Sequence, residues 1–172
     1  MSVPAMFDQA AFATGMNPNY ISPGVDSQHG VVWFRQPFVY TITFLNILAA
    51  GVVTNTTNIQ NDSYFVCTEQ TAFIVDHATG NTTITDPAVA PMLVQIVDTS
   101  SGKFISDNPV ALANWFGTGE RPFVWLARAQ VYRPGGQIQA QLTNNMATAQ
   151  DVRLAFIGFK IYQGIPDDSS TG

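Results

Sequence analysis

The segment Asp151–Tyr162 constrains the fold more than any other part of the sequence. Its alternate positions form two sets of side chains, and both sets are largely apolar. A strand with two apolar faces is typical of a strand covered on both sides. We therefore predict a central strand of a sheet, with one face on the core and the other under an N-terminal arm or a neighbouring subunit. One set is Val152, Leu154, Phe156, Gly158 and Tyr162, and the other is Arg153, Ala155, Ile157, Phe159 and Ile161.

Strand-like runs follow one another through residues 31–162, with turn signals between them. The run Phe38–Leu45 contains β-branched and aromatic residues with a period of two. Met92–Asp98 and Lys103–Ile105, separated by a Ser- and Gly-containing turn, are typical of a hairpin. The stretch Pro109–Phe116 fits either a short helix or an irregular strand. No long helical period separates the runs, so the sequence predicts an all-β fold, a jelly-roll-like antiparallel β-sandwich with an extended N-terminal arm.

The chain divides into three predicted zones. Residues 1–30 form an N-terminal arm with scattered large apolar groups, residues 31–162 form the β-sandwich domain, and residues 163–172 form a flexible C-terminal tail. A purely disordered segment carries fewer large apolar groups than this arm does, which indicates an arm that docks onto a surface. Trp and Arg are enriched at the energetic centres of interfaces. The predicted interface residues are Phe7, Phe12 and Tyr20 in the arm and Trp33, Phe34 and Arg35 where the arm joins the domain.

The scarcity of charge indicates how this protein works. Charged residues make up 11% of the chain, against about 25% in typical domains. A surface of amides and hydroxyls is easier to desolvate against a partner than a surface of ionised groups. Lys103 and Lys160 are the only lysines, so lysine does not protect the strand edges from pairing. We expect a protein that packs against other proteins, including copies of itself; an ordinary secreted β-sandwich is the alternative.

The same composition argues against several other partners. The formal net charge is −5 and no basic stripe is present, so direct nucleic-acid binding is not expected. No apolar run approaches the roughly 20 residues that a membrane-spanning helix needs, and the N-terminus lacks the pattern of a signal peptide. We predict a chain that is made in the cytoplasm and stays soluble.

Few residues offer chemistry. Cys67 lies in a strand-like run and is predicted to be a small buried hydrophobe. His77 follows Asp76, but no nucleophile motif accompanies the pair. Asp98 and Asp107 would supply oxygen ligands to calcium, although their spacing matches no EF-hand. We therefore predict no enzyme activity, no catalytic residue, no cofactor and no metal site.

The second half of the chain resembles a loose group of tailed-phage virion structural proteins. That group has no catalytic residues, and the resemblance covers about residues 92–162. It implies a minor capsid or decoration protein, or a head–tail collar or tail protein, that binds neighbouring virion subunits and resides in the virion after synthesis in the host cytoplasm. The residues that carry the resemblance are Met92–Asp98, Gly102-Lys103, Asn108-Pro109-Val110, Phe116–Pro122, Gly136, Gln141–Asn144 and Val152–Lys160.

A second class of function stays open beside this one. The three tryptophans, Trp33, Trp115 and Trp125, are able to stack on sugars, which keeps a carbohydrate-binding jelly-roll module for host-surface glycans as an alternative. That alternative predicts an exposed aromatic pair on a concave face. An enzyme is the third reading and would require His77 to meet a carboxylate in a pocket.

Overall fold

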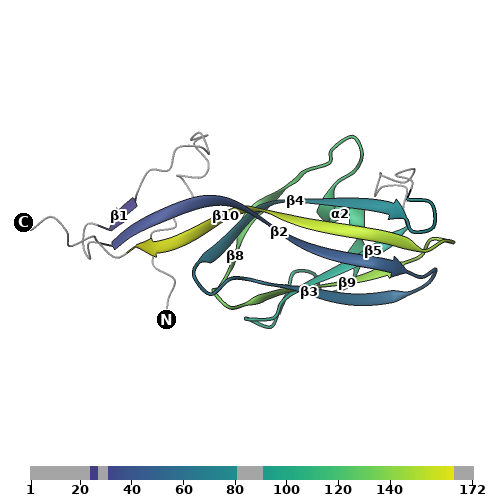
Figure 1. Cartoon of the computed structure of the whole chain (residues 1–172), viewed down its shortest axis with the longest axis horizontal. Coiled ribbons are helices and arrows are strands. Elements are labelled where there is room, and N and C mark those ends of the chain that lie inside the picture. Colours follow the sequence, from purple (N-terminus) through teal and green to yellow (C-terminus); the bar gives the residue numbers. More distant parts are fainter. Residues whose placement is uncertain (1–23, 27–30, 81–90, 165–172) are drawn as a thin grey trace, which may run out of the picture.

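The protein is an antiparallel β-sandwich, seen here in a computed structural model that describes residues 24–26, 31–80 and 91–164 (Figure 1). The first sheet, called sheet A, has the strand order β1-β2-β10-β4-β8. The second, sheet B, has the order β3-β9-β5-β6, and the short strand β7 also pairs with β5. The bounds of sheet A are β1 Gly24–Asp26, β2 Val31–Ile47, β10 Gln150–Gly164, β4 Tyr64–Asp76 and β8 Val124–Tyr132. The bounds of sheet B are β3 Val52–Asn58, β9 Gln137–Asn144, β5 Met92–Asp98, β6 Lys103–Phe104 and β7 Val110–Ala111.

The strand pairs are nested along the sequence. The innermost pair is β5 with β6, then β4 pairs with β8, β3 with β9, and β2 with β10. Successive pairs alternate between the two sheets, so each sheet is assembled from strands that are far apart in the chain. Such pairings close long loops, and the entropy of closing them is compensated only when the two inner faces pack together.

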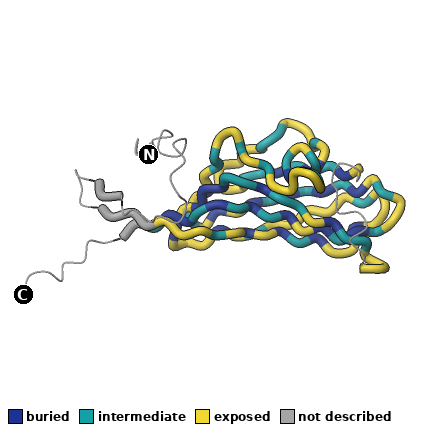
Figure 2. Tube along the Cα trace, turned by 90° about the horizontal axis from the view of Figure 1, so that it is seen from above, coloured by how far each residue is buried: buried dark blue, intermediate teal, exposed yellow. Residues whose placement is uncertain are grey.

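The predicted central strand is confirmed. β10 lies in the middle of sheet A and pairs with β2 on one side and β4 on the other. Its inner side chains Val152, Leu154 and Phe156 are fully buried against sheet B. Figure 2 shows the corresponding alternation of buried and more exposed positions along the strands.

Other predicted elements are also present. Tyr40, Ile42 and Phe44 on β2 point into the core, as their period of two predicted. The predicted hairpin is formed by β5 and β6, with Asp98 opposite Lys103. The ambiguous stretch before residue 117 contains both predicted elements, because β7 is followed directly by α2 (Leu112–Phe116), whose Leu112 and Phe116 are buried.

The structure refines the ends of the predicted domain. Gly24–Asp26, inside the predicted arm, form β1 and pair with the first residues of β2. At the other end β10 continues to Gly164, two residues into the predicted tail, because its backbone still pairs with β2 up to Val32. The rest of the predicted arm and residues 165–172 lie outside the described residues, so the arm and the tail stay predictions.

Gly158 sits at the closest approach of two strands. A side-chain Cβ at this position would lie 1.9 Å from the carbonyl oxygen of Val66 and 2.9 Å from the Cα of Cys67. The register between β10 and β4 shifts at this point, between Ile157 and Gly158. Only glycine allows the backbone of β4 to come this near to β10.

We expect Gly158→Ala to lower the free energy of unfolding by about 3 kcal/mol, because the added methyl group forces the two strands apart. Urea denaturation monitored by circular dichroism measures this change. Gly80→Ala is the matched control: Gly80 has φ +64 and open space around it. That variant should cost only about 1 kcal/mol, the strain of a left-handed conformation. Equal losses in the two variants would contradict the close-approach explanation.

Candidate protein-binding surface

A β-ribbon projects from one end of the sandwich. β10 pairs with β4 only as far as Ile161 opposite Tyr64, whereas β10 and β2 stay paired to Gly164 opposite Val32. Beyond that point the sheet consists of β1, the start of β2 and the end of β10. In Figure 1 these three segments extend well past the other strands. A ribbon of two or three strands without a second layer is marginally stable in water, so it benefits from packing against another surface.

A buried lysine anchors the base of this ribbon. Lys160 is 2% exposed, and its Nζ atom donates a hydrogen bond to Oε1 of Gln60. Nζ lies 4.1 Å from the centre of the Phe38 ring and 5.9 Å from the ring centres of Tyr40 and Tyr162. The carboxylate of Asp62 is 3.9 Å away. A buried ammonium ion needs such partners, because taking it out of water unpaired is very unfavourable.

This aromatic cage joins three parts of the chain. Phe38 and Tyr40 come from β2, Tyr162 from β10, and Gln60 from the loop between β3 and β4. Gln60 is tied further, because its backbone N–H donates to the Tyr40 hydroxyl at 3.1 Å. The ribbon therefore leaves the sandwich from a rigid base.

The outer face of sheet A carries two rows of mostly apolar residues that cross its strands, with Glu69 as their one charged member. Register places Val39, Ile157, Glu69 and Trp125 in one row. The next row is Pro37, Phe159, Val66 and Val131. Side chains in such rows contact their neighbours directly. Val39 is 48% exposed and Trp125 is 72% exposed, so an apolar face, here called the outer apolar face, stays open.

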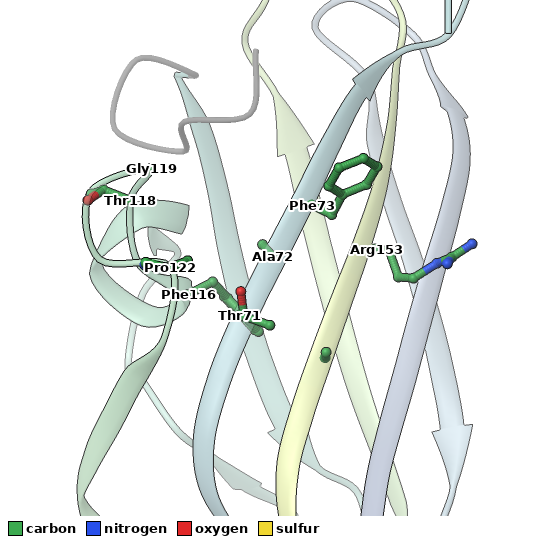
Figure 3. A pocket seen from close by; sticks show the side chains of 9 residues that line it. Thr71, Ala72, Phe73, Phe116, Thr118, Gly119, Pro122 and Arg153 are labelled. Atoms are coloured by element: carbon green, nitrogen blue, oxygen red, sulfur yellow. The ribbon is translucent and has the colours of Figure 1, made fainter. Parts of the chain in front are cut away.

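A shallow hollow lies beside the outer apolar face, between β4, β10 and the loop after α2 (Figure 3). Its volume is about 410 Å³, and its lining is largely apolar. Phe73, which is 48% exposed, lies on this face opposite Arg153 of β10. Figure 3 shows the Arg153 side chain directed away from Pro122 and over β2. The lining comprises Thr71, Ala72, Phe73, Phe116, Thr118, Gly119, Pro122, Arg153 and Ala155.

The outer face of sheet B has a different character. Thr54, Gln141 and Gln95 form one row across β3, β9 and β5, and the Gln141 side chain donates to Thr54 at 3.4 Å. The edge strand β3 contains no charged residue. Asn55 partly covers this edge by donating to the backbone carbonyl of Thr43 on β2, at 2.7 Å. This row is polar but uncharged, which makes it inexpensive to desolvate.

The predicted interface residues fall into two groups. Phe7, Phe12 and Tyr20 lie outside the described residues. Trp33, Phe34 and Arg35 lie on β2, on the projecting ribbon, where their backbones pair with β10. The structure therefore places half of the predicted set on one projecting element, while their role at an interface stays a prediction.

Sequence reasoning overlooked Lys160. Its position has the same parity as Phe156 and Gly158, so the alternation along β10 would have assigned it to the core face. A lysine is almost never fully buried unless it is paired, so the alternation alone was not taken to place Lys160 on the core face.

Four titratable side chains, those of Asp98, Lys103, Arg128 and Tyr132, line a second hollow of about 360 Å³, and His77 is not among them. Nδ1 of His77 lies 2.8 Å from Oδ1 of Asp151, and both side chains are partly exposed. The same carboxylate oxygen accepts a hydrogen bond from the backbone of Asn46 at 2.7 Å. This arrangement ties the turn after β4 to the start of β10 and to the end of β2. These contacts therefore hold the three segments together.

Among the described residues, three groups have a shifted pKa, and each has a local cause. Desolvation by burial raises the pKa of the Cys67 thiol to about 12. Burial also raises the pKa of Tyr132 well above its ordinary value. The backbone N–H of Thr79 lowers the pKa of Asp76, whose carboxylate caps the turn that follows β4. Cys67 is buried, as predicted, and its raised pKa makes it a poor nucleophile.

Asp98, one of the two residues that could supply oxygen ligands to calcium, has hydrogen-bonding partners in its own turn. Asp98 accepts hydrogen bonds from the hydroxyls of Ser100 and Ser101, both at 2.6 Å, and so caps the turn between β5 and β6. Within residues 24–26, 31–80 and 91–164, no three histidine, cysteine or acidic side chains group as metal ligands would. None of the described helices is long and apolar enough to cross a membrane.

The chain is similar to the crystal structure of the infectious bursal disease virus VP2 subviral particle, with 14% sequence identity and a TM-score of 0.28. The alignment covers 89% of this chain and 46% of that chain, so this chain spans less than half of its length. No protein-family model matches the sequence, and no curated protein matches it.

Two substitutions test the contribution of the Lys160 cage to stability. Lys160→Ala should lower the free energy of unfolding by about 3 kcal/mol, because it removes both the cation and the packing of its aliphatic stem. Lys160→Met keeps the stem and should cost about 1 kcal/mol, the loss of the cation–aromatic attraction. Urea denaturation measures both values. Equal losses of unfolding free energy in Lys160→Met and Lys160→Ala would show that packing of the aliphatic stem contributes little.

Cys67 should make the fold sensitive to alkaline pH. The folded state raises the thiol pKa from 9.0 to about 12, so it holds the proton more tightly than the unfolded chain does. Stability from this group is therefore full below pH 9 and falls as the pH rises towards 12. Urea denaturation at several pH values from about 8 to about 11 should show the free energy of unfolding falling as the pH rises. Cys67→Ala should reduce the slope without removing it, because Tyr132 acts in the same direction.

Proposed function

We propose that this protein is a structural component of a phage virion, a minor capsid or decoration protein that binds neighbouring virion subunits and stabilises the particle. The projecting ribbon of β1, β2 and β10 is the observation that carries this proposal. Within the described residues it has no second sheet beneath it, and it contains the sequence Val31-Val32-Trp33-Phe34. A neighbouring protein would supply the missing layer.

The resemblance to tailed-phage virion proteins supports the same proposal. The residues that carry it occupy β5, the loop after α2, the end of β9 and β10. They therefore belong to both sheets and to the element on which sheet A is centred. The family resemblance, like the ribbon, points to assembly as the function.

The mechanism is mechanical. Each subunit contributes a ribbon and weakly charged sheet faces, and contact with a neighbour removes these surfaces from water. Repetition of the same contact around a closed ring of copies would give avidity without any single strong interaction. A head–tail collar or a tail structure would use the same surfaces and is the alternative position of this protein on the particle.

The nested strand pairs support a jelly-roll assignment. Pairing β2 with β10, β3 with β9, β4 with β8 and β5 with β6 is the order that a long hairpin adopts when it is wrapped into two sheets. Jelly rolls build many viral capsid and lectin domains. The assignment is therefore compatible with both the structural proposal and the glycan alternative.

No catalysis is proposed for this chain. In the described residues the hollow beside Phe73 contains one ionisable side chain, Arg153, and no histidine or carboxylate. General acid–base work needs a proton donor or acceptor within reach of a substrate. The partly exposed pair of His77 and Asp151 has hydrogen-bonding partners but lies in no such hollow.

A glycan-binding function has one observation in its favour. The hollow presents the exposed ring of Phe73 together with the hydroxyls of Thr71 and Thr118. Stacking on an aromatic ring and hydrogen bonding to hydroxyls is how such a site would hold a sugar. Saturable binding of a glycan by the purified chain, lost in Phe73→Ala, would favour this alternative.

The solution mass of the purified protein tests the assembly proposal. We expect multi-angle light scattering to give a discrete oligomer, because the ribbon needs a covering surface. Replacing Trp33 and Phe34 together by alanine should shift the mass towards the monomer, since large apolar groups dominate interface energies. Trp125→Ala is the matched control, because Trp125 is an exposed tryptophan away from the ribbon.

An oligomer that is unaffected by the ribbon substitutions would contradict the ribbon as the interface. A monomer at every concentration, combined with saturable glycan binding, would overturn the structural proposal in favour of the glycan-binding module.

A further inference from the structure

The second hollow opens on the side of the sandwich where both sheets end. Sheet A ends at β8 and sheet B at β6, and the hollow lies between these two strands and α2. Its volume is about 360 Å³, and ligand pockets begin at about 300 Å³. It shares no lining residue with the hollow beside Phe73, and none of its lining residues lies on the strands of the projecting ribbon. It is therefore a separate feature of the surface.

A bulge in β8 borders this hollow. The register between β4 and β8 shifts there, so that Leu126–Ala129 stand opposite Thr68 alone. A bulge takes residues out of the ladder and redirects their side chains, and bulges are frequent next to functional sites. Two of the four bulged residues, Arg128 and Ala129, line the hollow. The irregularity of the strand is thus located where a ligand would meet it.

The hollow has two cations that are not paired within the described part of the chain. Lys103 and Arg128 are exposed, and neither forms an ion pair or a side-chain hydrogen bond with a described residue. Asp98 is the one acidic residue among the described lining residues, and its two oxygens accept hydrogen bonds from the hydroxyls of Ser100 and Ser101. Two cations against one carboxylate leave this hollow positive in a chain whose net charge is −5. A local charge of this sign favours an anionic ligand.

Aromatic rings and a hydrogen-bonding amide complete the lining. Phe104 on β6 is 60% exposed, and the half-buried Trp115 comes from α2. The Tyr132 hydroxyl donates a hydrogen bond to Oε1 of Gln130 at 2.8 Å. With that oxygen engaged, the amide nitrogen of Gln130 is the group able to donate to a ligand.

A sugar that carries a carboxylate fits this combination of groups. The C–H face of a sugar ring packs on an aromatic ring, its hydroxyls hydrogen-bond to polar side chains, and its carboxylate pairs with a cation. An entirely apolar ligand would leave both cations of the hollow unpaired. Phosphate-binding loops use glycine-rich turns that present backbone N–H groups, and no described residue of this lining is a glycine.

We propose that the hollow between β6 and β8 binds an acidic sugar. Lys103 and Arg128 pair with the carboxylate, and the exposed ring of Phe104 packs against the sugar ring. This site differs from the glycan alternative at Phe73 both in its location and in the charge that it requires of the ligand. The inference does not rest on the virion proposal, because binding here leaves the projecting ribbon open.

Calorimetric titration of the full chain with digalacturonate tests this proposal. We expect saturable binding with a Kd of about 1 mM or lower. Neutral galactobiose should bind at least about tenfold more weakly, because it lacks the carboxylates that pair with the two cations. The affinity for digalacturonate should also fall as salt is added, since exposed charges are screened.

Three outcomes of this titration would contradict the proposal. The absence of saturable digalacturonate binding at about 10 mM would show that the hollow does not hold an acidic sugar. Equal affinity for galactobiose would remove the role of the cations. Tighter binding of an acetylated dipeptide of two glutamates than of digalacturonate would identify an acidic peptide, and not a sugar, as the ligand.

Two substitutions locate the binding on the protein. Phe104→Ala and Arg128→Gln should each weaken digalacturonate binding by about tenfold, the loss of one ring contact or one charge-assisted hydrogen bond. Phe73→Ala and Arg121→Gln are the matched controls, because both residues are exposed and lie outside this lining. The controls should bind as the unchanged chain does. Full binding in both test variants, or an equal loss in the controls, would overturn the assignment to this hollow.

Discussion

The pairing of β10 on both of its edges is the constraint on which the rest of the structure depends. This strand carries the ladder that holds β2 and β4 in one sheet, and its inner side chains Val152, Leu154 and Phe156 cover the inner face of sheet B. Because β10 is longer than β4, the part that outlasts β4 has only β2 to pair with. The projecting ribbon is therefore a consequence of unequal strand lengths, and no separate domain is needed to produce it.

Much of the fold was predictable because strand signals are local. Alternation placed Tyr40 with Ile42 on one face of β2 and Leu154 with Phe156 on one face of β10, and the two apolar faces of β10 identified a central strand. The ribbon was not predictable, because the sequence of a strand does not show where its neighbour ends. Lys160 was missed for a different reason: a cage built from β2, β10 and the loop before β4 exists only after those three segments have come together.

The few charges of the chain are placed where they fix geometry. Lys160 closes the base of the ribbon, His77 and Asp151 tie a turn to the start of β10, and Asp98 caps the β5–β6 turn. The broad faces of the sandwich hold mostly amides, hydroxyls and apolar groups, with Glu69 and Arg153 as charged members on sheet A. Burying such faces involves little loss of ionic hydration, so a weak contact repeated in many copies is sufficient for assembly.

A subunit with an open apolar face and an open ribbon has to stay soluble before it assembles. An apolar face of several strands invites nonspecific association, which natural proteins limit by covering it. The ribbon has no second layer within the described residues, and a partner gains most by binding there. Association through the ribbon alone would favour a single geometry, which an ordered assembly requires.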